Sequence, residues 1–133
     1  MIYILNSRYK SAFRDLNLRI NDEILKFVDL PNDYSSGMKQ LYFIISEIIN
    51  NDLQYGNDLP EWIITQEDKF LIIQLNNRIN KSNFNGMGNS NIVSRIEDIK
   101  GTYSLNFSND NRISIICKIP LHSLFNHCEN NTI

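Results

Sequence analysis

A row of polar side chains follows one face of the helix that we predict over residues 34–55. Glu47, Asn51, Gln54 and Tyr55 lie at positions i, i+4, i+7 and i+8, which an α-helix stacks on one side. The row carries a carboxylate, carboxamides and an aromatic hydroxyl. A solvated helix face usually carries mixed charge and lysine, so this row indicates a face that looks into a cleft. The alternative is a partly exposed face with polar residues placed by chance.

Two further features lie beyond this helix. An apolar run over 70–75 ends at Asn76-Asn77, and Gly86-Met87-Gly88 precedes a helix predicted over 89–99. A carboxamide offers the donor and acceptor that match an adenine edge, and its oxygen suits Mg²⁺ beside phosphates and waters. Glycines before a helix N-terminus leave backbone N–H groups free to meet an anion. Together with the polar row, these features match the base, metal and phosphates of one nucleotide.

Each feature also has a purely structural interpretation. Glu47 and Asn51 are then a hydrogen-bonded pair on a helix surface, and Asn77 is a turn residue that tolerates a left-handed conformation. Gly86 and Gly88 are then a plain tight turn, because a short glycine motif is a weak signal by itself. The residues alone leave both interpretations open.

Hydrophobic periodicity predicts the elements that must position these residues. The helix over 34–55 buries an apolar stripe and stops at Gly56. The other expected elements are a strand over 16–20, an extended piece over 24–28, a hairpin of 62–64 and 70–75, a helix over 89–99, and strands over 103–107 and 113–118. Residues 1–15 fit either a short helical face of Tyr9, Phe13 and Leu16 or an irregular lead-in. The pattern predicts an α+β fold, a two-layer sandwich of a mixed, mostly antiparallel sheet with helices packed on one face.

Composition excludes several classes of protein. A chain of 133 residues with 42% hydrophobic content predicts one domain with one core. Its net charge of −2 argues against a general nucleic-acid binder. It lacks a long apolar run and a secretory signal, so no membrane span is expected. Cys117 and Cys128, like His122 and His127, lack metal-ligand spacing, and we expect a reduced, cytoplasmic protein.

Three stretches resemble the motifs of one family. SEIINNDLQYG is similar to its Asn box, GMGNSNIVSRIEDIKG to its glycine box, and NRISIICKIPL to its closing strand. The family is the catalytic ATP-binding domain of sensor histidine kinases, a Bergerat-fold domain of the GHKL (HATPase) superfamily. Only residues 78–85 separate the strand end from Gly86, as in the short-lid subfamilies. The resemblance covers 16–121, so we expect a single domain over 1–133 with a loose tail over 122–133.

The resemblance implies a role for each matching residue. It places a Mg²⁺ ligand at Asn51 and, at Glu47, the acidic residue that orients a water or acts as base in phosphoryl transfer. Tyr55 falls near the phosphates, and Gly86 and Gly88 bring the lid backbone against them. The implied cofactors are ATP and Mg²⁺.

The adenine position departs from the family pattern. Asn77 falls on the residue that accepts the adenine amino hydrogen, where the family usually has Asp followed by glycines. Gln54 is neutral where the family often has a basic residue, and Asn89 stands where Leu is usual. A charge-assisted hydrogen bond is roughly twice as strong as a neutral one, so we predict weaker ATP binding than the family norm, and not its loss.

The resemblance implies a Mg-ATP-binding kinase domain that passes the γ-phosphoryl group to a His on a separate dimerisation element. No His precedes Asn51, so the acceptor is expected elsewhere, on a phosphoacceptor domain or another protein of a response-regulator pathway. Two alternatives remain: a stand-alone anti-sigma-type Ser/Thr kinase, and a degenerate pseudo-kinase that serves as a nucleotide-sensing or interaction module.

Overall fold

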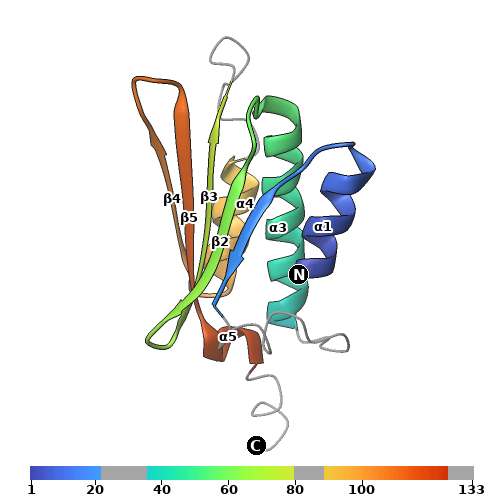
Figure 1. Cartoon of the computed structure of the whole chain (residues 1–133). Coiled ribbons are helices and arrows are strands. Elements are labelled where there is room, and N and C mark those ends of the chain that lie inside the picture. The colour runs from blue at the N-terminus through green and yellow to red at the C-terminus, as the bar shows by residue number, and fades with distance from the viewer. Residues whose placement is uncertain (22–35, 80–88, 126–133) are drawn as a thin grey trace, which may run out of the picture.

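The computed structural model describes residues 1–21, 36–79 and 89–125, which form one mixed sheet with helices against it (Figure 1). The elements in chain order are α1 (Ile2–Ser11), β1 (Asn17–Ile20), α3 (Ser36–Tyr55), β2 (Glu61–Glu67), β3 (Phe70–Arg78), α4 (Asn89–Asp98), β4 (Thr102–Phe107), β5 (Arg112–Pro120) and α5 (Leu121–Phe125).

The five strands lie in the order β1-β2-β3-β5-β4. β1 pairs with β2 in parallel, and the other neighbours pair antiparallel. Helices α1, α3 and α4 lie on one face of this sheet (Figure 1). The predicted two-layer α+β sandwich is therefore confirmed.

The core fills the space between α3 and the inner face of the sheet. The strands bury alternate residues because side chains of a strand point to opposite faces, and α3 buries residues three and four apart. Fully burying one such aliphatic side chain contributes about 1.5–3 kcal/mol. The fully buried large side chains of α3 and the central strand β3 include Leu41, Ile44, Ile45, Ile48, Ile49, Leu71, Ile73 and Leu75.

The N-terminal segment forms a helix, α1, which resolves the ambiguity over residues 1–15. Its buried positions are Leu5 and Tyr9, four residues apart, and they pack into the common core. Phe13 is 98% exposed and has a positive φ of 56°, so it lies beyond the helix end. The predicted face of Tyr9, Phe13 and Leu16 was therefore wrong, because the helix stops before Phe13 can return to that side.

One strand end differs from its prediction. β3 does not stop at Asn76-Asn77 but continues through both to Arg78, because each residue pairs with β5, opposite Ser114 and Ile113. The predicted second helix and last two strands are present within a few residues of their expected ends. The extended piece expected over 24–28 lies outside the described residues.

The start of α3 is packed tightly against α5. A Cβ atom on Gly37 would lie 2.1 Å from the carbonyl oxygen of Ser123, which is far inside van der Waals contact. Leu124 of α5 is buried in the core. The part of the expected tail that the structure describes is therefore a docked helix.

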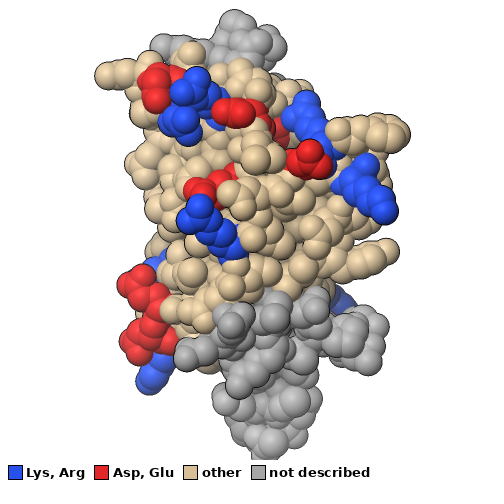
Figure 2. Space-filling view, viewed as in Figure 1, with Lys and Arg blue, Asp and Glu red and all other residues tan. Residues whose placement is uncertain are grey.

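Charged side chains do not form a field of one sign on the face shown in Figure 2. Basic and acidic groups alternate there. Among the described residues, Arg19 and Glu61 form an ion pair in which the Nη2 and Oε2 atoms lie 3.3 Å apart. This face therefore offers no broad potential to steer a highly charged partner. None of the helices in the described residues is long and apolar enough to cross a membrane.

Candidate functional site

The C-terminal end of α3, the end of β3 and the beginning of α4 lie at the same end of the molecule (Figure 1). Backbone contacts join the first two: Gly56 forms a bridge with Ile79, and the Asn57 N–H donates to the carbonyl of Arg78 at 2.9 Å. The polar row on α3 and Asn77 on β3 are thereby brought to one edge of the sandwich.

A buried hydrogen-bond network fixes this arrangement. The Asp52 carboxylate accepts from Asn77 Nδ2 at 2.6 Å through Oδ1 and from the Tyr9 hydroxyl at 2.6 Å through Oδ2. The Tyr9 oxygen in turn accepts from Trp62 Nε1 at 3.0 Å. The four residues come from α3, β3, α1 and β2, so the network ties these four elements to one carboxylate.

Asp52 is a site residue that the sequence prediction missed. It is 4% exposed and lies three residues after Ile49 and four after Ile48, on the apolar stripe of α3. A carboxylate on a buried stripe was the available signal, because such a group requires partners. Its partner Tyr9 lies 43 positions away in sequence, which no local pattern could reveal.

Burial dominates the electrostatics of this network. It raises the pKa of Asp52 above its usual value of 3.8, while the hydrogen bonds from Tyr9 and Asn77 and the nearby positive charge of Arg14 act in the opposite direction. Burial and the adjacent Asp52 likewise raise the pKa of Tyr9, so its hydroxyl remains a donor. Arg14 is held nearby because its Nη1 donates to the Gly56 carbonyl at 3.1 Å.

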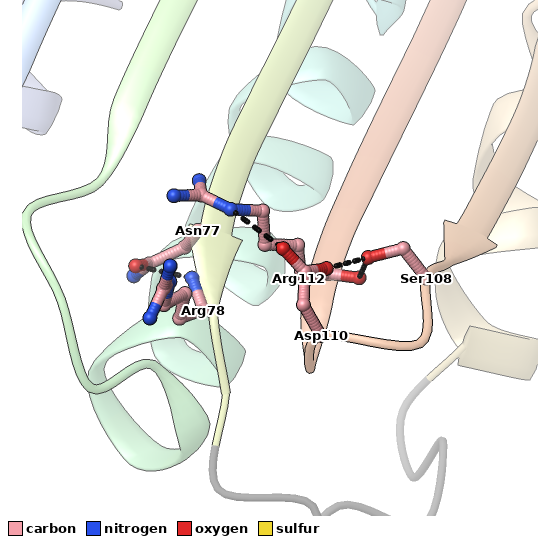
Figure 3. A network of polar contacts seen from close by, with 5 residues as sticks. All are labelled: Asn77, Arg78, Ser108, Asp110 and Arg112. Atoms are coloured by element: carbon pink, nitrogen blue, oxygen red, sulfur yellow. Dashed lines mark hydrogen bonds and ion pairs between the residues drawn. The ribbon is translucent and has the colours of Figure 1, made fainter.

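Asn77 lies within β3 and is 3% exposed, so its interpretation as a turn residue was wrong. Its Nδ2 donates to Asp52, and its Oδ1 accepts from the backbone N–H of Arg78 at 2.7 Å (Figure 3). Gly56 packs over the amide: a Cβ there would lie 2.4 Å from Asn77 Nδ2. The amide of Asn77, the residue predicted to accept from adenine, is therefore held from two sides.

The predicted row on α3 divides between core and surface. Glu47 and Asn51 are half-buried, Gln54 is exposed, and Tyr55 is buried at 7% exposure. Within the described part of the chain, no hydrogen bond or ion pair engages the side chains of Glu47 and Asn51.

The neighbouring Asn50 points away from the row. It is exposed and accepts a hydrogen bond from Arg8 of α1, as expected for a residue one position before the proposed metal ligand. Gly86 and Gly88, the predicted phosphate contacts, lie outside the described residues.

Arg95 of α4 has a structural role. Its Nη1 donates to Gln40 Oε1 at 3.0 Å, and its guanidinium lies 4.3 Å from the ring centre of Phe43. Both partners belong to α3, so Arg95 joins the two helices.

A hollow of about 380 Å³ borders Asn77 at the end of the sheet. Arg112 lies on its wall, and its Nε pairs with Asp110 at 3.3 Å, while Ser108 also donates to Asp110 (Figure 3). Of the predicted site residues that the structure describes, only Asn77 lines this hollow, together with Glu61, Asn76, Asn106, Phe107, Ser108, Arg112, Ile113 and Ser114. It is therefore distinct from the row on α3.

Comparison with known proteins gives matches in structure alone. No family model matches the chain, and no curated protein matches its sequence. The histidine kinase domain of the Erythrobacter litoralis EL346 blue-light activated histidine kinase superimposes with a TM-score of 0.64 at 14% identity, covering 91% of this chain and 59% of that chain.

Two further kinases give similar results. The Acinetobacter baumannii histidine kinase AdeS has a TM-score of 0.57 at 13% identity, covering 90% of this chain and 60% of that chain. The nucleotide-free catalytic domain of histidine kinase ThkA has a TM-score of 0.59 at 16% identity, covering 90% of this chain and 86% of that chain. The chain therefore has the fold of histidine kinase catalytic domains, and it spans about three fifths of the first two proteins.

Proposed function

We propose that this chain is a Mg-ATP-binding catalytic domain of the histidine kinase type. One observation carries the proposal: the Asp52–Asn77 hydrogen bond fixes the end of α3 against the end of β3. Asn51, one residue before Asp52, is thereby brought to the edge where Asn77 lies. The same fold in histidine kinase catalytic domains supports this assignment.

The chemistry of the available groups fits a magnesium nucleotide. Mg²⁺ usually keeps several waters and takes only one or two protein ligands beside substrate phosphates. The half-buried Asn51 amide oxygen suits one such position, and the bound ion would neutralise charge on the phosphates. Glu47, one turn earlier on the same helix, would orient a water or accept a proton, and Asn77 would accept from the adenine amino group.

The remaining parts of the proposal concern the reaction and its partners. Tyr55 would border the phosphates, and the backbone of Gly86 and Gly88 would close over them. The bond from the γ-phosphorus to its bridging oxygen would break, and a bond to a His nitrogen on a separate phosphoacceptor element would form. We place this reaction in the cytoplasm, with a partner from a response-regulator pathway.

Isothermal titration calorimetry with Mg-ATP tests binding, and two asparagines provide a matched pair of variants. Asn51→Ala should abolish the Mg²⁺ dependence of ATP binding and leave the fold intact. Asn50→Ala makes the same chemical change on an exposed side chain that contacts Arg8, so it should bind as the wild type does. The absence of binding heat at millimolar Mg-ATP, or unchanged Mg²⁺ dependence in Asn51→Ala, contradicts the proposal.

A pseudo-kinase is the second candidate, because the Asn77 amide is engaged at both polar atoms and almost fully buried. A ligand that binds only the folded state must raise the melting temperature by mass action. No thermal shift with Mg-ATP or Mg-ADP would favour this candidate. If the chain binds ATP and transfers phosphate, the acid stability of the phosphorylated product distinguishes a histidine kinase from the alternative Ser/Thr kinase. Phosphohistidine is labile to acid, and phosphoserine is not.

A further inference from the structure

Asp52 controls which way the carboxamide of Asn77 faces. A carboxylate can only accept hydrogen bonds, so the amide nitrogen of Asn77 must face Asp52 Oδ1, at 2.6 Å. A backbone N–H can only donate, so the amide oxygen must face Arg78, at 2.7 Å. The two contacts agree with each other, and rotating the amide by half a turn would break both.

This orientation leaves only an acceptor available at Asn77. An amide oxygen has two lone pairs, and the Arg78 N–H uses one of them. The nitrogen side is covered, because Gly56 packs so closely that a Cβ on it would lie 2.4 Å from Nδ2. The carboxylate also polarises the amide through their hydrogen bond, which strengthens the oxygen as an acceptor.

We propose that Asp52 is a positioning residue that makes the site select a purine with a 6-amino group over one with a 6-oxo group. The inference rests on the proposed function, in which Asn77 meets the purine edge. An amino group donates to the Asn77 oxygen, whereas a 6-oxo group would place two acceptors against each other. The site therefore prefers ATP to GTP, and the preference originates in a residue that does not contact the base.

The ratio of the dissociation constants for Mg-GTP and Mg-ATP tests this selectivity. In Asp52→Asn the side chain at position 52 is an amide that competes for the orientation of Asn77, and the ratio should fall by about tenfold, the equivalent of about 1.4 kcal/mol. Tyr9→Phe is the matched control, because it removes a hydrogen bond from the other carboxylate oxygen and leaves the Asn77 contact. Its ratio should equal that of the wild type.

An exchange of the two groups gives a second test. The double variant Asp52→Asn with Asn77→Asp moves the carboxylate onto the strand and keeps one donor and one acceptor across the same contact. Position 77 again presents an oxygen, so the ratio should return toward the wild-type value. Because all partners remain satisfied, this variant should fold even where Asp52→Asn alone does not. A fluorescence spectrum of the buried Trp62 verifies folding in each case.

The outcomes separate the inference from the proposed function. A wild type that binds neither nucleotide overturns the proposed function and the selectivity with it. A wild type that binds ATP and GTP equally retains the function and overturns the role of Asp52. The role of Asp52 is also overturned if a folded Asp52→Asn variant has an unchanged ratio of dissociation constants, or if a folded exchange variant does not discriminate between ATP and GTP.

Discussion

Removal of one hydroxyl group should reveal how much stability depends on the buried network. In Tyr9→Phe the ring remains in the core, and only the oxygen is lost. That oxygen donates to Asp52 Oδ2 at 2.6 Å and accepts from Trp62 Nε1 at 3.0 Å. The substitution therefore leaves a buried acceptor and a buried donor without their partner while creating little cavity.

The structure sets the size of the effect. A buried polar group left unsatisfied costs about 1–3 kcal/mol, and more when it is charged. With two such groups, Tyr9→Phe should lower the free energy of unfolding by about 3 kcal/mol near neutral pH. This loss is large beside the 5–15 kcal/mol typical of a whole domain. The deficit should shrink as pH falls, because the Tyr9 hydroxyl lowers the pKa of Asp52, and without it the carboxyl takes up a proton more readily.

Urea unfolding measures this change, with the chain's one tryptophan, Trp62, as the fluorescent probe. Tyr3→Phe makes the same substitution on the same helix at a side chain that is 77% exposed, so it should change stability very little. The difference between the free energies of unfolding of the two variants, measured at several pH values, gives the contribution of the buried network. A difference below about 1 kcal/mol, or one that is constant from neutral to acid pH, would refute this account of Asp52.

Three further perturbations follow from other features of the structure. Gly37→Ala should destabilise the fold by at least about 2 kcal/mol, seen in urea unfolding, because the new methyl group must displace the Ser123 carbonyl. The pKa of Asp52 in the folded protein is raised above its ordinary value of about 3.8. The wild type should therefore lose stability as the pH rises from about 3.8 to the pKa of Asp52 in the folded protein. Urea midpoints of Asp52→Asn should lack this fall. Burial raises the pKa of Cys117 to about 12, so in a Cys128→Ser background a thiol reagent should react with Cys117 only after denaturation.

The sequence predicted the elements whose signals are local. The helix ending at Tyr55 has an apolar period of three to four residues, which fixes its buried side. The hairpin strands were predicted from runs of β-branched and aromatic residues that flank a short polar turn. The end of β3 was mispredicted because Asn76 and Asn77 have a low intrinsic strand preference. Pairing with β5 outweighs that preference, since it provides hydrogen-bond partners for their backbones.

The candidate site was predicted only where its residues belong to a local sequence pattern. Asn51 and Glu47 could be identified from their spacing on one helix, and Asn77 from its place after an apolar run. Their assignment to Mg²⁺, phosphoryl transfer and adenine stays a prediction that the nucleotide experiments test. The polar network behind Asn77 was not predicted, because Tyr9 looked like one member of an ambiguous helical face.

The amino-acid sequence by itself determined the layers of this protein, since hydrophobic periods within short segments specify helices, strands and their buried sides. It also placed the candidate nucleotide contacts on those elements. Only the tertiary structure decided that a carboxylate on α3 meets a tyrosine from α1 and an asparagine from β3. Those contacts join residues 43 and 25 positions apart, and distances of that kind are set by the packing of whole elements and not by any local pattern.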